Sequence, residues 1–181
     1  EADQLTDRLQ AVLEAIYAAF ATDWDDFSDK VQAENDLTAE ALWLARLVVE
    51  LMPQQAEAKG LLALMLYCEA RRSARRSPEN AYIALSEQNT ALWSRPMIEE
   101  AEQLLTQALA LGPLGPFQLE ASIQSAHCMR LTTGHNNWRD IVEIYDRLAT
   151  MAPTLGVLIS RAAAVAELLG PQVGLEALAA L

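Results

Sequence analysis

Cysteine is scarce in this chain of 181 residues, which holds only Cys68 and Cys128. Two cysteines are too few for the disulfide framework of a small secreted domain. Both stand in apolar segments with helical periodicity, so we expect two reduced thiols in the interior of a cytoplasmic protein.

Long apolar runs are also missing. No stretch reaches the roughly 18 residues that a membrane span needs, because Arg46, Glu50, Lys59 and Glu69 interrupt the most hydrophobic part. No signal peptide precedes the first residue, so we expect a soluble protein without a membrane contact. The chain begins with Glu rather than Met and ends inside an amphipathic pattern, which predicts a C-terminal fragment of a longer chain with residues 1–181 as one domain.

Basic residues are few: 13 Lys and Arg stand against 25 Asp and Glu, for a formal net charge of -12. Phosphate contacts need a basic surface, so direct binding to nucleic acid is not expected. Residues 1–40 hold eleven acidic residues against Arg8 and Lys30, a sum of -9. The negative charge is therefore concentrated at the N-terminal end.

Glycine and proline number seven each and stand mostly at segment ends, whereas Ala, Leu, Glu and Gln dominate. This composition favours helices and gives strands little support. Hydrophobic residues make up 52% of the chain, enough for a sizeable core. Apolar spacing predicts helices over about 4–21, 38–52, 54–74, 95–111, 116–133, 138–151 and 154–169, and an eighth that begins after Gly170.

The helical segments end in a recurring way. An apolar helix stops at Pro53, again at Pro113 and again at Pro153. Trp138-x-x-Ile141-x-x-x-Tyr145 also matches the opening of a tetratricopeptide repeat helix. The prolines are 60 and 40 residues apart rather than a steady 34, because insertions such as the segment after Arg75 interrupt the pattern. We expect an all-α, right-handed stack of antiparallel hairpins, degenerate and tetratricopeptide-like, with about 7–8 helices and a concave binding surface.

Catalytic and metal-binding motifs are absent from the sequence. Adjacent helix positions diverge, so His127 and Cys128 are expected to pack in the core rather than bind one metal. His135 adds no complete tetrahedral ligand set. There is no glycine-rich phosphate loop, nucleophile elbow or His-Glu-x-x-His motif. We therefore expect neither an enzyme nor a cofactor.

Arg71, Arg72 and Arg75 form the one basic cluster, with Arg76 beside it. Spacings of three and four residues place them on shared faces of the third predicted helix. The arginines either complement that helix C-terminus and pair with the acidic segment, or they bind an anion or an acidic partner.

Four tryptophans are expected to lie mainly in the core or to close hairpins. Trp24 and Trp93, near loops, are the better candidates for exposed binding anchors. Together with the acidic segment and the arginines, the candidate partner-binding residues are Asp23, Trp24, Asp25, Asp26, Arg71, Arg72, Arg75 and Trp93.

Several strings occur together in a fixed order. They are Leu-Ala-Leu-Met-Leu at 62–66, Ala-Arg-Arg-Ser-Ala-Arg at 70–75, Gln88, Trp93, Gly-Pro-Phe-Gln-Leu at 115–119, Ala-x-Ile-x-x-Ala-His at 121–127, the Trp138 motif through Asp146, Pro153, Arg-Ala-x-Ala-Val-Ala at 161–166 and Gly-Pro-x-x-Gly-Leu at 170–175. This series, over roughly residues 8–181, resembles the long C-terminal extension of certain bacterial extracytoplasmic-function RNA polymerase sigma factors.

The resemblance implies a tetratricopeptide-like domain that follows the promoter-binding regions and modulates the sigma factor through protein contacts. Its implied partners are the sigma regions of the same chain, RNA polymerase or a regulatory protein. The sequence departs from the family in two places. Phe-Ala-Thr-Asp-Trp at 20–24 replaces Phe-Asn-Glu-Gly-Tyr, and the charged turn and Gln-Asp-Arg string of the insertion are replaced by Ser-Pro-Glu-Asn-Ala at 77–81 and Gln-Asn-Thr at 88–90. These changes indicate a divergent member whose partner differs.

Three functions remain open from the sequence. The first is a regulatory domain of such a sigma factor, which either masks the DNA-binding helices with its acidic segment or supports them for polymerase binding. The second is an independent helical-repeat adaptor that holds a peptide. The third is a sensor of small anionic or aromatic molecules that uses a cleft near Arg71, Arg72 and Trp93.

Overall fold

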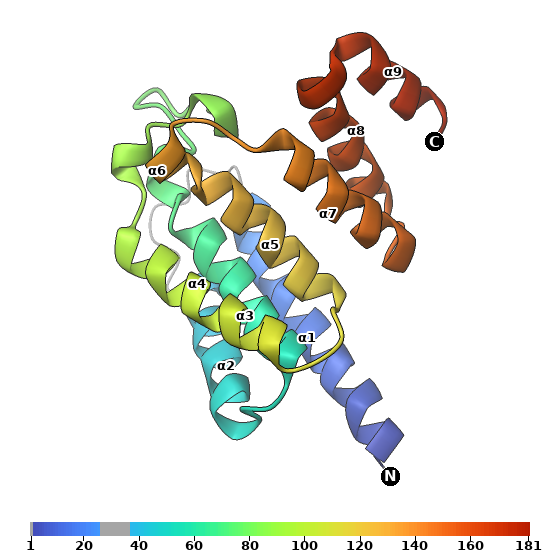
Figure 1. Ribbon diagram of the computed structural model, residues 1–181. Helices are drawn as coiled ribbons and strands as arrows, with labels where there is room; N and C mark the ends of the chain where they lie inside the picture. The colour runs from blue at the N-terminus through green and yellow to red at the C-terminus, as the bar shows by residue number, and fades with distance from the viewer. Residues whose placement is uncertain (1, 26–36) are drawn as a thin grey trace.

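A computed structural model describes residues 2–25 and 37–181, and the side chains of 8–22 and 37–181. The predicted all-α class is confirmed, because every long element among these residues is a helix (Figure 1). The α-helices are α1 (Ala2–Asp25), α2 (Leu37–Leu51), α3 (Ala56–Glu69), α4 (Arg95–Ala110), α5 (Pro116–Cys128), α6 (Arg130–Thr133), α7 (Trp138–Met151), α8 (Leu155–Leu169) and α9 (Pro171–Ala179).

Neighbouring helices pack as hairpins that stack on one another. α1 packs on α2, α3 on α4, and α7 on α8, while α9 folds back on α8. α5 lies between α3 and α7 and joins the two halves of the molecule. The predicted helical stack is thus observed, since no hairpin could bury both of its faces alone.

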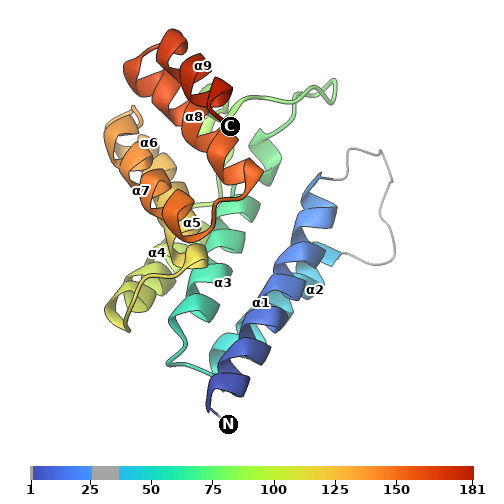
Figure 2. The same cartoon turned by 90° about the vertical axis from the view of Figure 1, so that its right-hand side faces the viewer.

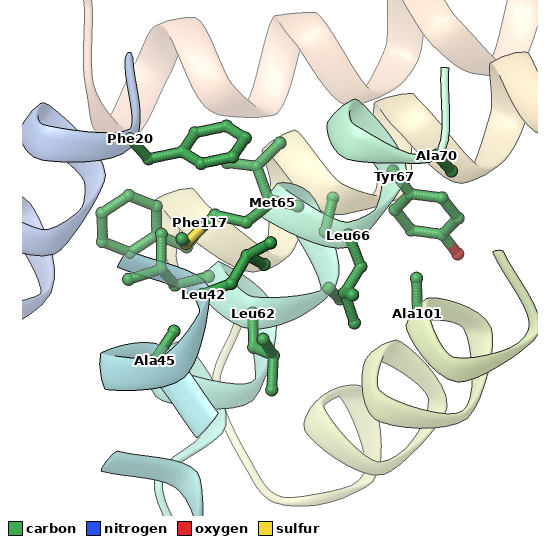
Figure 3. Packing of buried hydrophobic residues seen from close by; sticks show 14 of the residues in the cluster. Phe20, Leu42, Ala45, Leu62, Met65, Leu66, Tyr67, Ala70, Ala101 and Phe117 are labelled. Carbon is green, nitrogen blue, oxygen red and sulfur yellow. The ribbon is translucent and has the colours of Figure 1, made fainter. Parts of the chain in front are cut away.

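The main core surrounds α3. Ten consecutive residues of this helix, from Ala58 to Tyr67, are buried. Figure 3 shows Phe20 of α1, Leu42 of α2 and Phe117 of α5 packed around it. A helix that is apolar on all sides must be covered on all sides, and α3 therefore determines where its four neighbours lie.

A second, smaller core joins α5 to α7 and α8. Its buried members are Leu119, Ile123, Ile141, Leu148 and Ala164. Because α5 contributes to both cores, its remaining face is the one available to a surface site.

Two predicted helices end earlier in the structure than in the prediction. The helix expected over 54–74 ends at Glu69, and a 3₁₀ turn (Arg72–Ala74) follows it. The helix expected over 116–133 is interrupted at Met129 and continues as the single turn α6. Gly134, at φ 76°, then closes that turn in the left-handed conformation that favours glycine.

The helix starts agree better with the sequence. α7 begins at Trp138 behind Asn137, whose side chain accepts a hydrogen bond from the Asp140 amide. Thr154 caps α8 in the same way through the Val157 amide. Ser94 precedes α4, but its side chain makes no capping hydrogen bond.

Some residues expected in the core lie at the surface. Trp43 is 62% exposed and Val12 is 46% exposed. Both belong to the α1–α2 hairpin, which is covered by α3 on one face only. These two side chains therefore lie outside the area of the hairpin that α3 covers.

Two glycines allow the closest approaches between helices. A Cβ on Gly60 of α3 would lie 2.8 Å from the backbone nitrogen of Gln118 in α5. A Cβ on Gly174 of α9 would lie 2.4 Å from the Cβ of Ala166 in α8. Ala63 and Ala162 are also buried, so small side chains set the spacing of the stack.

None of the helices in the described part of the chain has the length and apolar character that crossing a membrane requires.

Candidate functional site

Three adjoining hollows form one groove along the stack. Their volumes are about 310, 430 and 370 Å³, and Tyr145 of α7 lines all three. Figure 2 shows α1 on one side of α3 and α5, and α7 and α8 on the other. We call this surface the central groove; its polar and aromatic lining residues include Tyr17, Arg71, Arg75, Tyr82, Gln88, Glu120, Gln124, His127, Tyr145 and Ser160.

The floor of the central groove is one face of α5. Glu120, Gln124 and His127 stand at positions i, i+4 and i+7, which share a helix face. Leu119 and Ile123 flank this face and are buried in the second core. The apolar residues orient α5 so that its polar face is directed into the groove.

The basic end of the groove is built around Arg71. This side chain is only 7% exposed. Its Nε donates to the Tyr67 carbonyl oxygen at 3.2 Å, and its Nη2 donates to Oε1 of Gln124. Arg75 lines the same hollow. Two of the predicted arginines are therefore brought together beside the floor of the groove.

Arg72 points to a different surface. Its Nε pairs with Oε2 of Glu69 at 2.7 Å, and its Nη2 donates to Oγ1 of Thr38 in α2 at 2.6 Å. The prediction that the arginines share faces of one helix is wrong, because α3 ends at Glu69 and the turn that follows separates the side chains.

Trp93 is a buried support rather than an exposed anchor, so that prediction is also wrong. The side chain is 4% exposed. The guanidinium carbons of Arg71 and Arg130 lie 5.9 and 5.2 Å from the centroid of its ring. A tryptophan ring attracts cations to its face, so the indole holds two arginines at the basic end of the groove.

Arg130 also fastens the segment that closes this end of the groove. Its two terminal nitrogens donate to the carbonyl oxygens of Leu85, Ser86 and Gln88 at 2.8, 2.7 and 2.6 Å. Leu85 and Gln88 line the groove. The predicted insertion after Arg75 is thereby tied to α6 and forms a wall.

Glu120 is the acidic group of the floor. The hydroxyl of Tyr17 donates to its Oε2 at 3.4 Å. Burial raises the pKa of Glu120, the Glu57 charge adds to this effect, and the Tyr17 hydrogen bond opposes it. Burial likewise raises the pKa of Tyr145, and a hydrogen bond with Ser160 opposes that shift.

His127 is neutral at physiological pH. Burial is the main cause that lowers its pKa to about 4, and the charges of Arg71 and Arg130 act in the same direction. Its ring packs edge-on against Trp138 with 5.5 Å between the centroids. The expected core packing of His127 and Cys128 is confirmed, since both are buried.

The thiols are not activated. Both cysteines are free, as predicted. Burial raises the pKa of Cys68, although Arg71 and Arg75 oppose the shift, and burial raises the pKa of Cys128 to about 12. Within residues 2–25 and 37–181, no three His, Cys, Asp or Glu residues gather closely enough to hold a metal ion. The groove thus offers hydrogen bonds, charge and aromatic surface for binding.

The structure does not test the predicted acidic surface. Asp26 and the side chains of Asp23, Trp24 and Asp25 lie outside the described residues. Sequence reasoning missed Tyr17, Glu120, Gln124 and Tyr145 as groove residues. The available signal was the polar series Glu120, Gln124 and His127, which lies between apolar positions of the same helix.

A model of a protein family matches residues 8–109, which run from α1 through most of α4. Its description is "Family of unknown function (DUF6596)". The chain belongs to this family. The match includes the α1 and α3 sides of the groove and ends before α5, so the DUF6596 segment carries Tyr17, Arg71 and Arg75 but not the floor.

A curated relative extends over the rest of the groove. An uncharacterized protein of Rhizobium meliloti (strain 1021) is 34% identical over 169 residues, which cover 93% of this chain and 40% of the relative. The chain therefore spans well under half the length of the relative that it matches. No solved structure matches the chain.

Proposed function

We propose that this chain is a regulatory protein-interaction domain of an extracytoplasmic-function sigma factor, with no catalysis of its own. The observation that carries the proposal is the central groove, which continues across α1, α3, α5, α7 and α8 and is lined by polar and aromatic side chains. A groove of this shape suits an extended protein segment.

Two further observations support the link to a sigma factor. The ordered motifs of the sequence resemble the C-terminal extension of these proteins. The matched relative is much longer than this chain, so it has room for promoter-binding regions outside the match. In this proposal the domain acts in the bacterial cytoplasm, touches the sigma regions or RNA polymerase, and makes no direct nucleic-acid contact.

The test uses the full-length gene product. We expect it to bind core RNA polymerase and to start transcription from its own promoter in a purified system. Removal of this domain distinguishes the two regulatory versions: transcription rises if the domain masks the sigma regions and falls if it supports them. A full-length protein that neither binds core polymerase nor transcribes contradicts the sigma-factor assignment and leaves the adaptor and sensor functions.

A groove-filling variant tests whether the groove is the working surface. Ser160 is exposed and lines the groove, so Ser160→Trp is expected to reproduce the effect of removing the domain. Thr106→Trp is the matched control, because Thr106 is an exposed α4 residue away from the groove lining. If both variants and the unchanged protein transcribe equally, the groove is not the surface through which the domain acts.

The acidic segment is tested separately. Charge reversal at Asp23, Asp25 and Asp26 is expected to change transcription if these residues mask a basic DNA-binding helix, because opposite charges attract across such a contact. Unchanged transcription and unchanged polymerase binding would remove the acidic segment from the mechanism.

A further inference from the structure

We infer that the basic end of the central groove is a carboxylate-binding site, and that its occupant is an extended acidic segment of the protein partner. The inference rests on the proposed function only in taking a protein segment as the ligand. The carboxylate site itself follows from the charges around Arg71.

Arg71 is buried among neutral groups. Its contacts are the Tyr67 carbonyl oxygen, the Gln124 side-chain amide and the face of Trp93. No carboxylate lies among these contacts within the described part of the chain. A buried charge without a counter-charge is costly. An anion bound at this position therefore gains more binding free energy than it would on an open surface.

Other cations add to the positive field at this place. Arg75 lines the same hollow as Arg71. Arg130 lies close enough that the charge of Arg71 lowers its pKa, after the larger effect of burial. The same two charges, Arg71 and Arg130, act to lower the pKa of His127. On a chain with a net charge of -12, this end of the groove is a local concentration of positive charge.

Arginine is suited to carboxylates. Its planar guanidinium presents several N–H donors and binds a carboxylate through two parallel hydrogen bonds. The side-chain amides of Gln88 and Gln124 line the same hollow. Gln88 donates through Nε2 to the Ile83 carbonyl oxygen at 3.2 Å, which holds its side chain at the wall.

The floor adds a second requirement on the bound segment. Glu120 lies one helical turn from Gln124, a separation of roughly 6 Å along the axis. An extended peptide advances roughly 3.3 Å per residue, so two peptide residues span about this distance. When an acidic residue of the peptide lies beside Gln124, the residue two positions away faces Glu120, and a hydrogen-bond donor or a Lys suits that position. The partner segment therefore carries an acidic residue and, two positions away, a donor or a cation.

The length of the groove favours a peptide over a free small acid. Beyond Glu120 the groove continues along α7 and α8 through a hollow of about 430 Å³, and a further hollow of about 370 Å³ adjoins the basic end beside His127. Tyr17 and Tyr145 line this part, and tyrosines suit peptide contacts because they combine a large apolar ring with a hydroxyl. A small carboxylate would fill only the basic end.

The experiment is an array of overlapping twelve-residue peptides that cover the remainder of the full-length protein and the subunits of core RNA polymerase, probed with this chain. The peptides that bind are expected to contain Asp or Glu, and replacing that residue by its amide is expected to weaken binding about tenfold or more. Arrays that show no binding, or binding without a preference for the acid over its amide, overturn the inference.

Four variants locate the contact. Arg75→Gln removes a groove cation, and Gln124→Glu places a competing carboxylate beside Arg71; each is expected to lower affinity about tenfold or more. Glu120→Gln removes the carboxylate that faces the donor or cation of the segment and is expected to lower affinity as well. Arg72→Gln is the matched control, because Arg72 contacts Glu69 and Thr38 outside the groove. The inference is overturned if Arg75→Gln and Gln124→Glu, with folding verified by circular dichroism, bind the peptides as tightly as the unchanged protein does.

Free glutarate separates the two sources of a carboxylate. We expect it to compete with the bound peptides only weakly, and binding as tight as that of the peptides contradicts a protein segment as occupant.

The results of the peptide experiments are independent of the polymerase assay. Acid-dependent peptide binding without polymerase binding refutes the sigma-factor function alone, whereas domain-dependent transcription with unaffected groove variants refutes the carboxylate site alone.

Discussion

The carboxylate of Glu57, in the first turn of α3, accepts a hydrogen bond from the Phe117 amide in the first turn of α5 at 3.0 Å. The same carboxylate accepts the Gln118 amide at 3.1 Å and the Gln118 side-chain Nε2 at 3.2 Å. Gly115, the residue before α5, has no side chain to cap it. Glu57 therefore caps a helix that begins about sixty residues later in the chain, and it holds the floor of the groove against α3.

Glu57→Gln tests this cap. The amide keeps an acceptor oxygen but loses the charge that favours an acidic group at a helix N-terminus. We expect the free energy of unfolding to fall by about 1–2 kcal/mol, measured by urea denaturation. Exposed Glu99 in α4 supplies the control, because Glu99→Gln is expected to change stability by less than about 0.5 kcal/mol.

Gly115→Ala disturbs the same contact from the other side. The new Cβ would lie 2.2 Å from the side-chain carboxyl carbon of Glu57, which forces the capping carboxylate away. The loss is expected to resemble that of Glu57→Gln. The double variant should cost less than the sum of the two single variants, since both remove one interaction. Strict additivity would show that Gly115 matters for another reason.

Gly60→Ala is expected to destabilise the protein strongly. The Cβ would meet the Gln118 backbone nitrogen at 2.8 Å and its Cγ at 2.9 Å, and the backbone of a packed helix cannot move aside cheaply. We expect a loss of about 1–3 kcal/mol in thermal or urea unfolding. Gly156→Ala, where the nearest atom is 4.0 Å away, is expected to raise stability by up to about 1 kcal/mol.

Arg130→Lys is expected to loosen the wall of the groove. Lysine cannot reproduce a fork that donates to three carbonyl oxygens at once. Limited trypsin digestion followed by mass spectrometry should show faster cleavage at Arg76, which is the nearest basic residue before Leu85. The matched variant is Arg139→Lys, because Arg139 is an exposed residue of α7. It should leave cleavage at Arg76 unchanged. Equal rates in both variants would contradict the fastening role.

The protein is expected to lose stability as the pH falls below about 6.5. Since the pKa of His127 is about 4 in the folded protein and 6.5 in its ordinary state, the unfolded chain binds more protons between these values. This group alone should cost on the order of 2 kcal/mol between pH 7 and pH 5. Urea denaturation at both pH values checks the direction.

A variant isolates the contribution of His127 from that of the carboxyl groups. Glu120 acts in the opposite direction, because a raised pKa makes the folded state the better proton acceptor. His127→Gln should therefore show a smaller loss between pH 7 and pH 5 than the unchanged protein. An equal loss in both proteins would assign the pH dependence to other groups.

The two thiols should resist modification in the folded protein. The thiolate is the reactive form, and burial raises the pKa of both Cys68 and Cys128. Titration with a chromogenic disulfide reagent at a mildly alkaline pH is expected to find no fast-reacting thiol in native buffer and both thiols in denaturant. A fast native reaction at Cys68, which lines the groove, would contradict the expected shift.

The sequence by itself determined the class of fold and most of the helix boundaries. Apolar residues at helical spacing are a local property of the chain, and so are the proline and glycine signals that end a helix. This is why the segment over 138–151 was predicted with the bounds that α7 has. The same local signals did not predict the end of α3 at Glu69 or the break at Met129.

The tertiary structure decided which residues form the groove. Arg71 and Arg72 are adjacent in the chain, yet one faces the groove and the other faces α2. Trp93 resembled an exposed anchor because it stands near a loop, but Arg71 and Arg130 cover its faces from two other elements. Tyr17, Glu120 and Tyr145 line one hollow only because α3 and α5 hold α1 and α7 on either side of it. The spacing of apolar residues predicts which face of a helix is buried. Which helix covers that face depends on packing between segments far apart in sequence.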